Sequence, residues 1–316
     1  MGRVVPDPTL PDPPRAGRTR WLLWLAILSS VTTVVVSSGL ITSFYVSAGG
    51  QAAAQPAASV PATGAPLTVA LARTPGGSSE WRTYAGAIAR MGEAAGRPIR
   101  VRYVESRSDM SGLLLTGRVD AAFLCTYCYL EVAGQPGVSL VAAPAIAGHE
   151  NDAAVLIVRG DSKETSLAAL KGHRVAVTSP TSLAGHAYLL WLAERDSIDA
   201  VGTLLLVAQD SQEESIRALL ANKVDAAVVN RSQLAAWSDA GIRVIASSPE
   251  FGMPPFVTGA TVDDATRERM RAALVSMRPS SGSTRTSIDG FTVPTDDDYD
   301  FARTLERYAR DPEGSQ

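Results

Sequence analysis

Short apolar runs alternate with longer amphipathic stretches along the chain from about residue 66 onward. The runs at 67–72 (LTVALA), 99–105 and 120–124 have the length and composition of buried strands. The stretch 79–95 repeats apolar residues at helical spacing, and a second helical pattern (MSGLLLTGRV) precedes residue 120. Strands that alternate with helices predict an α/β body with a mostly parallel sheet.

The pattern repeats within the chain. LLLTGRVDAAFL at 113–124 recurs as ALLANKVDAAVV at 218–229, and each copy follows a similar opening strand, LTVALA at 67–72 and HRVAVTS at 173–179. Because a repeated order of strand, helix and strand is typical of duplicated structural units, we expect two similar lobes. The alternative is a chance match among the plentiful Ala, Leu and Val residues.

A long uncharged stretch precedes this body. No charged residue lies between Trp21 and Ala72, and residues 21–46 are apolar enough and long enough for a helix across a bilayer. Arg15, Arg18 and Arg20 flank its N-terminal side. The positive-inside rule therefore predicts that residues 1–20 are cytoplasmic and that the body is extracytoplasmic at the cell membrane. The alternative is a signal peptide cleaved near Ala52–Ala54, but its apolar core is normally shorter. Residues 47–65, rich in Gly, Ala and Pro, predict a flexible linker.

The charge of the chain narrows its possible partners. The net charge is −3, and the body carries no basic patch of the kind that binds nucleic acid, so we expect no nucleic-acid partner. An anionic ligand must instead be held locally, by backbone N–H groups and hydroxyls. The sequence also lacks H-E-x-x-H, G-x-S-x-G and Walker-type motifs. We therefore expect no enzyme activity, metal or cofactor.

The loops that follow the predicted strands are the candidate ligand sites. Ligands of open α/β sheets bind beyond the carboxyl ends of the strands, which here means the stretches 73–80, 125–129, 179–186 and 230–233. Ser179, Thr181 and Ser182 crowd the start of a predicted helix, followed by Gly185 and His186. A helix N-terminus with several hydroxyls favours a bound anion. The alternative is that Ser179 or Thr181 only caps the helix.

Two further loops contribute candidate ligand-binding residues. Thr74 lies in a Gly-rich turn that leads into a predicted helix, and the alternative for this turn is an ordinary helix start. Thr126, Tyr127 and Tyr129 follow a buried strand, where an aromatic ring can form the wall of a pocket. The alternative for the tyrosines is a place in the core.

Cys125 and Cys128 are the only two cysteines. Outside the cytoplasm such a C-x-x-C pair is expected to form a small-loop disulfide. The same spacing occurs in thiol–disulfide redox sites, which leaves a membrane-anchored oxidoreductase as an alternative function.

Three blocks of sequence resemble the PhnD-like family, the periplasmic phosphonate-, phosphate- and phosphite-binding proteins of ABC importers. The blocks are GRVDAAFLCTYCYLEVAG (117–134), LIVRGDSKETSLAALKGHRVAVTSPTSLAGH (156–186) and IDGFTVPTDDDYDFARTLE (288–306), and the similarity spans about 67–310. Two positions depart from the family pattern. Cys125-Thr126 replaces a Gly-Pro pair, and Ser211-Gln212 replaces a Ser-His pair.

The resemblance implies a two-lobe, periplasmic-binding-protein-like fold of type II with a ligand cleft, preceded here by the N-terminal transmembrane helix. It implies lobe 1 at 66–150 and 254–316 and lobe 2 at 151–253. By the same resemblance, Ser179, Thr181 and Ser182 contact the anion, Gly185 and His186 complete the helix start, and Tyr127 and Tyr129 line the opposite side.

The implied function is capture of a small oxyanion, such as a phosphonate or phosphate, by closure of the two lobes. The implied partner is the permease of an ABC transporter. Apart from the oxidoreductase, a ligand-binding sensor subunit that signals to a membrane partner is a further alternative.

Overall fold

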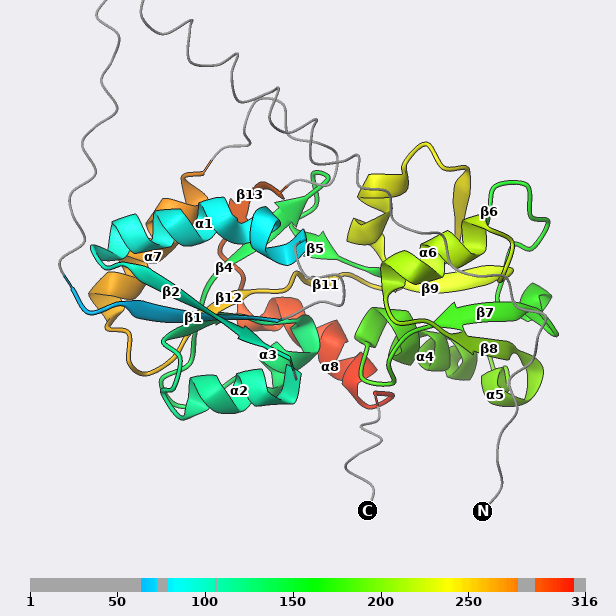
Figure 1. The fold of residues 1–316 in the computed structure, drawn as a ribbon. Helices are drawn as coiled ribbons and strands as arrows, with labels where there is room; N and C mark the ends of the chain where they lie inside the picture. Colours follow the sequence, from blue (N-terminus) through cyan, green and yellow to red (C-terminus); the bar gives the residue numbers. More distant parts are fainter. Residues whose placement is uncertain (1–63, 73–78, 106, 278–287, 310–316) are drawn as a thin grey trace, which may run out of the picture. The chain divides into compact units, whose positions relative to one another are not determined.

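The computed structural model describes residues 64–72, 79–105, 107–277 and 288–309. These residues fold into two β-sheets with flanking helices (Figure 1). The predicted cytoplasmic segment, the transmembrane span at 21–46 and nearly all of the linker lie outside the described ranges. Within those ranges, no helix is both long enough and apolar enough to cross a membrane.

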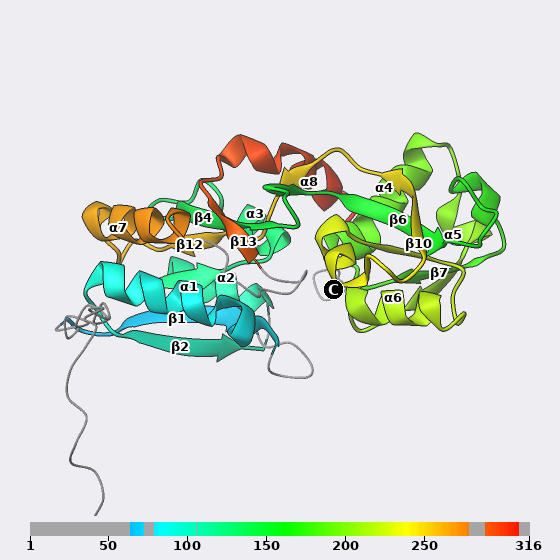
Figure 2. The same cartoon turned by 90° about the horizontal axis from the view of Figure 1, so that it is seen from above.

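The first sheet has six strands in the order β13-β4-β12-β3-β1-β2. β1 runs parallel to both of its neighbours, whereas β4, β12 and β13 pair in antiparallel fashion. Helices α1 and α7 lie side by side on one face, and α2 and α3 lie on the other (Figures 1 and 2). The elements are β1 (Leu67–Ala72), α1 (Ser79–Ala95), β2 (Ile99–Val104), α2 (Arg107–Leu115), β3 (Ala121–Phe123), α3 (Thr126–Val132), β4 (Ser139–Ile146), β12 (Phe256–Thr258), α7 (Asp264–Val275) and β13 (Ile288–Thr292).

The second sheet has five strands in the order β10-β6-β9-β7-β8. β7 runs parallel to β8 and β9, and β6 pairs antiparallel with β9 and β10. Its elements are β6 (Ala154–Arg159), η1 (Ala168–Leu170), β7 (Arg174–Val177), η2 (Leu183–Ala187), α4 (Tyr188–Arg195), α5 (Ala200–Thr203), β8 (Leu205–Ala208), α6 (Gln212–Leu220), β9 (Ala226–Asn230), η3 (Arg231–Trp237) and β10 (Ile242–Ser247).

The two-lobe α/β fold predicted from the sequence is confirmed, but the mostly parallel sheet is wrong. Each sheet combines three parallel strands with antiparallel ones. The reason is the path of the chain, which leaves the first sheet after β4 and returns to it at β12. The returning strand enters between β3 and β4 and runs opposite to both. The periodicity of a short apolar run does not reveal the direction of the strand.

Two short strands carry the chain from one sheet to the other and back. β5 (Asn151–Asp152) precedes β6, β11 (Phe251–Gly252) follows β10, and the two pair as an antiparallel ribbon. The C-terminal helices η4 (Asp296–Tyr299) and α8 (Asp300–Glu306) pack against this crossing. One buried apolar cluster contains side chains from both sheets and from α8, so the core continues across the crossing.

The aspartate of each repeat, Asp120 or Asp225, makes the same hydrogen bonds in its own sheet. In the first sheet, the carboxylate of Asp120 accepts the backbone N–H of Thr68 at 2.7 Å, and the N–H of Asp120 donates to the carbonyl of Thr68 at 2.8 Å. In the second sheet, Asp225 makes the same pair of bonds with Arg174, at 2.9 and 2.8 Å. Each aspartate therefore ties the strand that follows it to the opening strand of its lobe.

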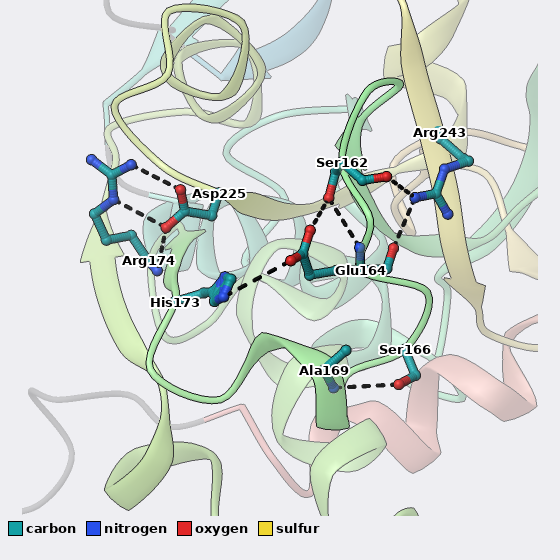
Figure 3. A network of polar contacts seen from close by, with 8 residues as sticks. All are labelled: Ser162, Glu164, Ser166, Ala169, His173, Arg174, Asp225 and Arg243. Atoms are coloured by element: carbon teal, nitrogen blue, oxygen red, sulfur yellow. Dashed lines mark hydrogen bonds and ion pairs between the residues drawn. The ribbon is translucent and has the colours of Figure 1, made fainter.

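Asp225 is also paired with the side chain of Arg174 (Figure 3). The guanidinium Nη2 donates to Oδ1 at 2.8 Å and Nε donates to Oδ2 at 3.1 Å. These bonds, together with the backbone N–H of Arg174, lower the pKa of Asp225 from the ordinary value of 3.8 to about 2. The ionised carboxylate therefore stabilises the folded state at neutral pH.

Substitution of this carboxylate should lower stability in a pH-dependent manner. We expect Asp225→Asn to reduce the free energy of unfolding at pH 7 by ~1–2 kcal/mol, after allowance for the partial exposure of the pair. The contribution of Asp225 is present above its unfolded pKa and is lost as the pH falls from about 4 to about 2. Denaturant unfolding across pH 7 to pH 2 measures it. Asp210→Asn, at an exposed loop position, is the control, and equal losses in both variants would contradict the assignment.

Candidate functional site

The loop after β7 brings five predicted site residues together at the start of one helical segment. η2 continues directly into α4, so the helix runs without a break from 183 to 195. Ser182 is its N-cap, because its Oγ accepts the N–H of Gly185 at 3.1 Å. The capping role that the sequence allowed for Ser179 or Thr181 therefore falls to Ser182.

Ser179 and Thr181 pair with one another at the surface of this loop. Ser179 is exposed, Thr181 is half-buried, and their hydroxyl oxygens lie 3.0 Å apart. One hydroxyl proton is used in that bond. The other hydroxyl can still donate to a ligand, next to the N–H groups at the positive end of the helix.

Gly185 holds the loop close to the end of β7. The N–H of Thr178 donates to the carbonyl of Gly185 at 2.8 Å. A Cβ added at Gly185 would overlap Thr178 Oγ1 and would come within 2.8 Å of Ser182 Oγ. The hydroxyl of Thr178 is buried and has no hydrogen-bond partner among the described residues. Only glycine allows this close approach, and His186 follows it as a half-buried residue of η2.

A second group of predicted residues forms the first turn of α3. Cys125 is the N-cap, and it forms a disulfide with Cys128 across a Cα–Cα distance of 5.1 Å. Thr126 is buried, and its Oγ1 donates to the carbonyl of Gly252 in β11 at 3.2 Å. Tyr127 is half-buried. This turn therefore contacts the crossing between the sheets.

Tyr129 is more deeply buried than a residue at the wall of an open pocket would be. Its side chain is 4% exposed, its ring packs on Tyr299 at 4.4 Å between centroids, and its hydroxyl donates to Asp296 Oδ1 at 2.7 Å. Burial and that hydrogen bond raise the pKa of Tyr129. The same hydroxyl, followed by Arg303, lowers the pKa of Asp296. The hydroxyl of Tyr129 is thus already used to hold α3 against the C-terminal segment. Thr74 lies outside the described residues.

The loop after β9 contains a network of hydrogen bonds. The sequence predicted this loop as a candidate ligand site only because it follows a strand. Asn230 donates through Nδ2 to Asp152 at 2.9 Å and exchanges two hydrogen bonds with the amide of Gln212, at 2.7 and 2.9 Å. Ser232 donates to Asp152 through both its N–H and its hydroxyl, at 3.0 and 2.6 Å. Gln212 is a residue at which the sequence departs from the pattern of the family it resembles. A neutral amide there can pair with Asn230, which single-residue reasoning does not predict.

A cavity of about 300 Å³ lies elsewhere, against the turn before β5 and against η3. Two of the residues that line it, Arg231 and Ser232, belong to the predicted stretch 230–233, and the others lie outside the predicted ligand stretches. Within the described residues, no cluster of three or more His, Cys, Asp or Glu side chains could hold a metal ion.

Comparison with known proteins identifies the family. The model of the periplasmic substrate-binding proteins of ABC phosphonate transporters matches residues 77–299. The chain belongs to this family. It is therefore a solute-binding protein of the transporter type, and its body belongs to the extracytoplasmic class. No curated protein sequence matches the chain.

Solved structures share the fold at low sequence identity. A binding protein component of an ABC phosphonate transporter from Pseudomonas aeruginosa is 18% identical, with a TM-score of 0.59 over 77% of this chain and 86% of that one. PhnD1 from Prochlorococcus marinus, in complex with methylphosphonate, is 12% identical, with a TM-score of 0.60 over 77% and 97%. A Xanthomonas citri protein bound to ATP is 16% identical, with a TM-score of 0.57 over 77% and 96%.

Family membership also argues against a thiol–disulfide oxidoreductase, the alternative function that the two cysteines suggested. The family consists of ligand-binding transport components and not of thiol–disulfide oxidoreductases. In the structure, Cys128 is buried at 1% exposure, so the disulfide closes the first turn of α3.

The close packing of Gly185 gives a testable consequence. Gly185→Ala should cost about 1–3 kcal/mol of folding free energy, because the new methyl group overlaps Thr178 Oγ1. Adding Thr178→Ala should restore part of this loss, since it removes that oxygen. Thr178→Ala alone should cost little, because the hydroxyl has no partner within the described residues. Denaturant unfolding of the two single variants and the double variant measures the coupling.

The matched control is Gly112→Ala in α2, where an added Cβ meets open space. It should be neutral or should stabilise by up to ~1 kcal/mol, as in other helix interiors. Strictly additive losses from Gly185→Ala and Thr178→Ala would contradict the proposed packing.

Proposed function

We propose that this chain is a membrane-tethered substrate-binding protein that captures a small oxyanion of the phosphonate or phosphate class for an ABC importer. The observation that carries the proposal is the loop Ser179–Ser182. In a chain of the phosphonate-binding family, this loop presents a hydroxyl pair at the N-terminus of an unbroken helix.

The chemistry of this loop suits a small anion. The chain has a net charge of −3, so long-range attraction does not favour an anionic ligand. A local site is then needed, made from hydroxyl donors, helical N–H groups and the helix dipole. Ser179 and Thr181 are the proposed direct donors. Ser182 contributes by holding the helix start, because its Oγ is occupied by the N–H of Gly185.

Two of the solved structures that share the fold support the ligand class. The P. marinus relative holds methylphosphonate, and the P. aeruginosa relative is described as part of a phosphonate transporter. Among the predicted residues of lobe 1, Tyr127 is the proposed wall opposite the anion, because it is half-buried, whereas Thr126 and Tyr129 are buried. Thr74 and His186 are proposed as further contacts from their positions in the sequence.

Ligand capture is proposed to occur by closure of lobe 1 (66–150 and 254–316) over lobe 2 (151–253). β5 and β11 are the segments where the chain passes between the two sheets, so bending is expected there. The closed form is then proposed to dock on the permease, with residues 21–46 keeping the body near it. The uncharged stretch and its flanking arginines support this tether.

Removal of the hydroxyl pair tests the site. Ser179→Ala with Thr181→Ala should weaken binding more than about a hundredfold, since each lost charge-assisted hydrogen bond is worth ~1.5–3 kcal/mol. The ligand is first found by thermal-shift screening of the full chain in detergent with methylphosphonate, 2-aminoethylphosphonate, phosphate, phosphite and sulfate. A ligand at 100 times its Kd stabilises by about 2.7 kcal/mol. Calorimetric titration then compares the parent and the variant.

Two control variants separate binding from folding. Ser182→Ala should lower stability without ligand by ~1 kcal/mol, because it removes a helix cap. Ser166→Ala, which removes the acceptor of the Ala169 N–H just before η1 in the same lobe, should leave binding unchanged (Figure 3). Unchanged affinity in the Ser179/Thr181 double variant would contradict the proposed site. A lower melting temperature of the unliganded double variant at unchanged affinity would assign the Ser179–Thr181 hydrogen bond to the stability of the loop alone.

The proposed tether has its own test. In cells that express the protein, it should remain in the membrane fraction after a carbonate wash. External protease should remove the body and spare a short N-terminal stub. A soluble mature form that begins near Gln55 would show instead that residues 21–46 are a signal peptide.

A further inference from the structure

All the lysines of the chain, Lys163, Lys171 and Lys223, belong to turns at one end of the second sheet. β6 starts beside the crossing and runs away from it, whereas β9 and its parallel neighbour β7 run in the opposite direction. The turn after β6 and the turns before β7 and β9 therefore meet at the end of the sheet that lies opposite the crossing. Each turn carries one exposed lysine. We call this end, made of residues 159–164, 171–174 and 221–225, the distal end of lobe 2.

The acidic side chains of these turns, and the one that caps α5, are already bonded within the protein (Figure 3). The pairs are Asp161 with Arg159, Asp225 with Arg174, Glu164 with the hydroxyl of Ser162, and Asp199 with the N–H of Gly202. By contrast, no lysine side chain forms an ion pair or a hydrogen bond within the part of the chain that the structure describes. The positive charges of the lysines therefore remain available to a partner outside the chain.

The kind of cation indicates the kind of partner. Arg243 at the start of β10 is fixed, because its Nη2 donates to the carbonyls of Ser162 and Glu164, at 2.8 Å each. A lysine ammonium on an unbonded four-carbon stem is instead a mobile point charge. Mobile charges spread over three turns suit a surface with many negative charges, such as the phosphates of a bilayer, better than a single anion in a fixed pocket.

Two exposed apolar side chains stand beside the lysines. Val201 in α5 and Leu205 at the start of β8 are 74% and 58% exposed, the highest values among the large apolar side chains that the structure describes. Figures 1 and 2 both show α5 at this end of the sheet. Lys171 lies next to it, because the N–H of the following residue, Gly172, donates to the carbonyl of Thr203 at 2.8 Å. Cations around protruding apolar groups match a bilayer surface, where phosphates overlie apolar chains.

We propose that the distal end of lobe 2 docks on an anionic phospholipid bilayer. The lysines contact lipid phosphates, and Val201 and Leu205 insert between the head groups. The proposal rests on the proposed tether, because residues 21–46 keep the body beside a membrane. The chain as a whole has a net charge of −3, so its other surfaces are not drawn to anionic lipid, and docking orients the body. The oxyanion loop follows the opposite end of β7 and therefore stays open to its ligand.

The test uses the full chain in lipid nanodiscs and a fluorophore that reports contact with lipid. Val201→Cys carries the fluorophore NBD, and the discs contain a phosphatidylcholine with a quenching nitroxide on its acyl chain. Quenching should be at least about twofold stronger in discs half made of phosphatidylglycerol than in discs of phosphatidylcholine alone. High salt should remove most of this difference, because it screens the lysines. Equal quenching in both discs would overturn the proposal and leave the lysines to an acidic protein surface.

A charge reversal tests the lysines themselves. Lys163→Glu, Lys171→Glu and Lys223→Glu together should lower quenching in the phosphatidylglycerol discs to the level seen in phosphatidylcholine. The same three lysines changed to Gln should lower it in the same direction without adding negative charge. The matched control reverses three exposed arginines of lobe 1, Arg100→Glu, Arg102→Glu and Arg118→Glu.

The control variant has the same net charge as the lysine-to-glutamate variant and should keep the quenching of the parent. Equal losses in the two variants, or full quenching in the lysine variants, would overturn the assignment to the distal end. The melting temperature of each variant verifies that it is folded.

A second label position tests the orientation of the body. NBD at Leu115→Cys, an exposed position of α2 in lobe 1, should be quenched weakly and equally in both kinds of disc. Quenching at Leu115 as strong as at Val201 would overturn docking through the distal end. Retention of the chain in the discs reports the tether and quenching reports the docking, so the two proposals can fail separately.

Discussion

A buried carboxylate at the crossing between the sheets constrains much of the surrounding structure. Asp152 in β5 is 1% exposed, and it accepts hydrogen bonds from its neighbour Ala153, from Asn230 at the end of β9 and from Ser232 in η3. A carboxylate in such a place is costly unless donors surround it. These bonds therefore fix the loop after β9 to the first crossing, and through Asn230 they also position Gln212 at the start of α6.

The second crossing, β11, is held in place by contacts with α3 and with the C-terminal segment. Gly252 in β11 accepts the hydroxyl of Thr126, and an added Cβ there would lie 2.5 Å from the ring of Tyr299. Tyr299 in turn donates to the carbonyl of Met253 at 2.9 Å. In the same C-terminal segment, Phe301 packs edge-on against Trp191 of α4, with ring centroids 5.1 Å apart. The C-terminal helices thus contact α3, the crossing and α4 together. These contacts link the two helices whose first turns carry the predicted site residues.

Local patterns predicted much of this fold. The apolar runs located β1 and β7, and the repeated VDAA located β3 and β9, because the aspartate before each strand makes the same bonds in both lobes. The hydroxyl-rich start of η2 was visible for the same reason, since capping chemistry acts over three or four residues. The antiparallel strands β4, β12 and β6 were not predicted as such, because their direction depends on the path of the chain between the sheets.

The contacts that decide the role of single side chains were also beyond local reasoning. Tyr129 bonds to Asp296, and Thr126 to Gly252, across more than a hundred residues of sequence. Asp152 has no motif that marks it as a buried acceptor. The cavity beside η3 arises only when three separate segments meet. Long-range packing therefore determined which candidate hydroxyls stayed available for a ligand and which were used within the protein.

The distance between the two lobes, measured with and without ligand, tests the central claim most directly. Spin labels at Leu115→Cys on α2 and Val201→Cys on α5 report it by double electron–electron resonance, because both positions are exposed and belong to different sheets. The native cysteines are paired with each other and do not take up label. The account predicts that a saturating phosphonate or phosphate ligand shifts the distance distribution to one narrower population, and that the Ser179→Ala/Thr181→Ala variant does not respond at the same concentration. An identical distribution with and without saturating ligand would contradict ligand capture by lobe closure.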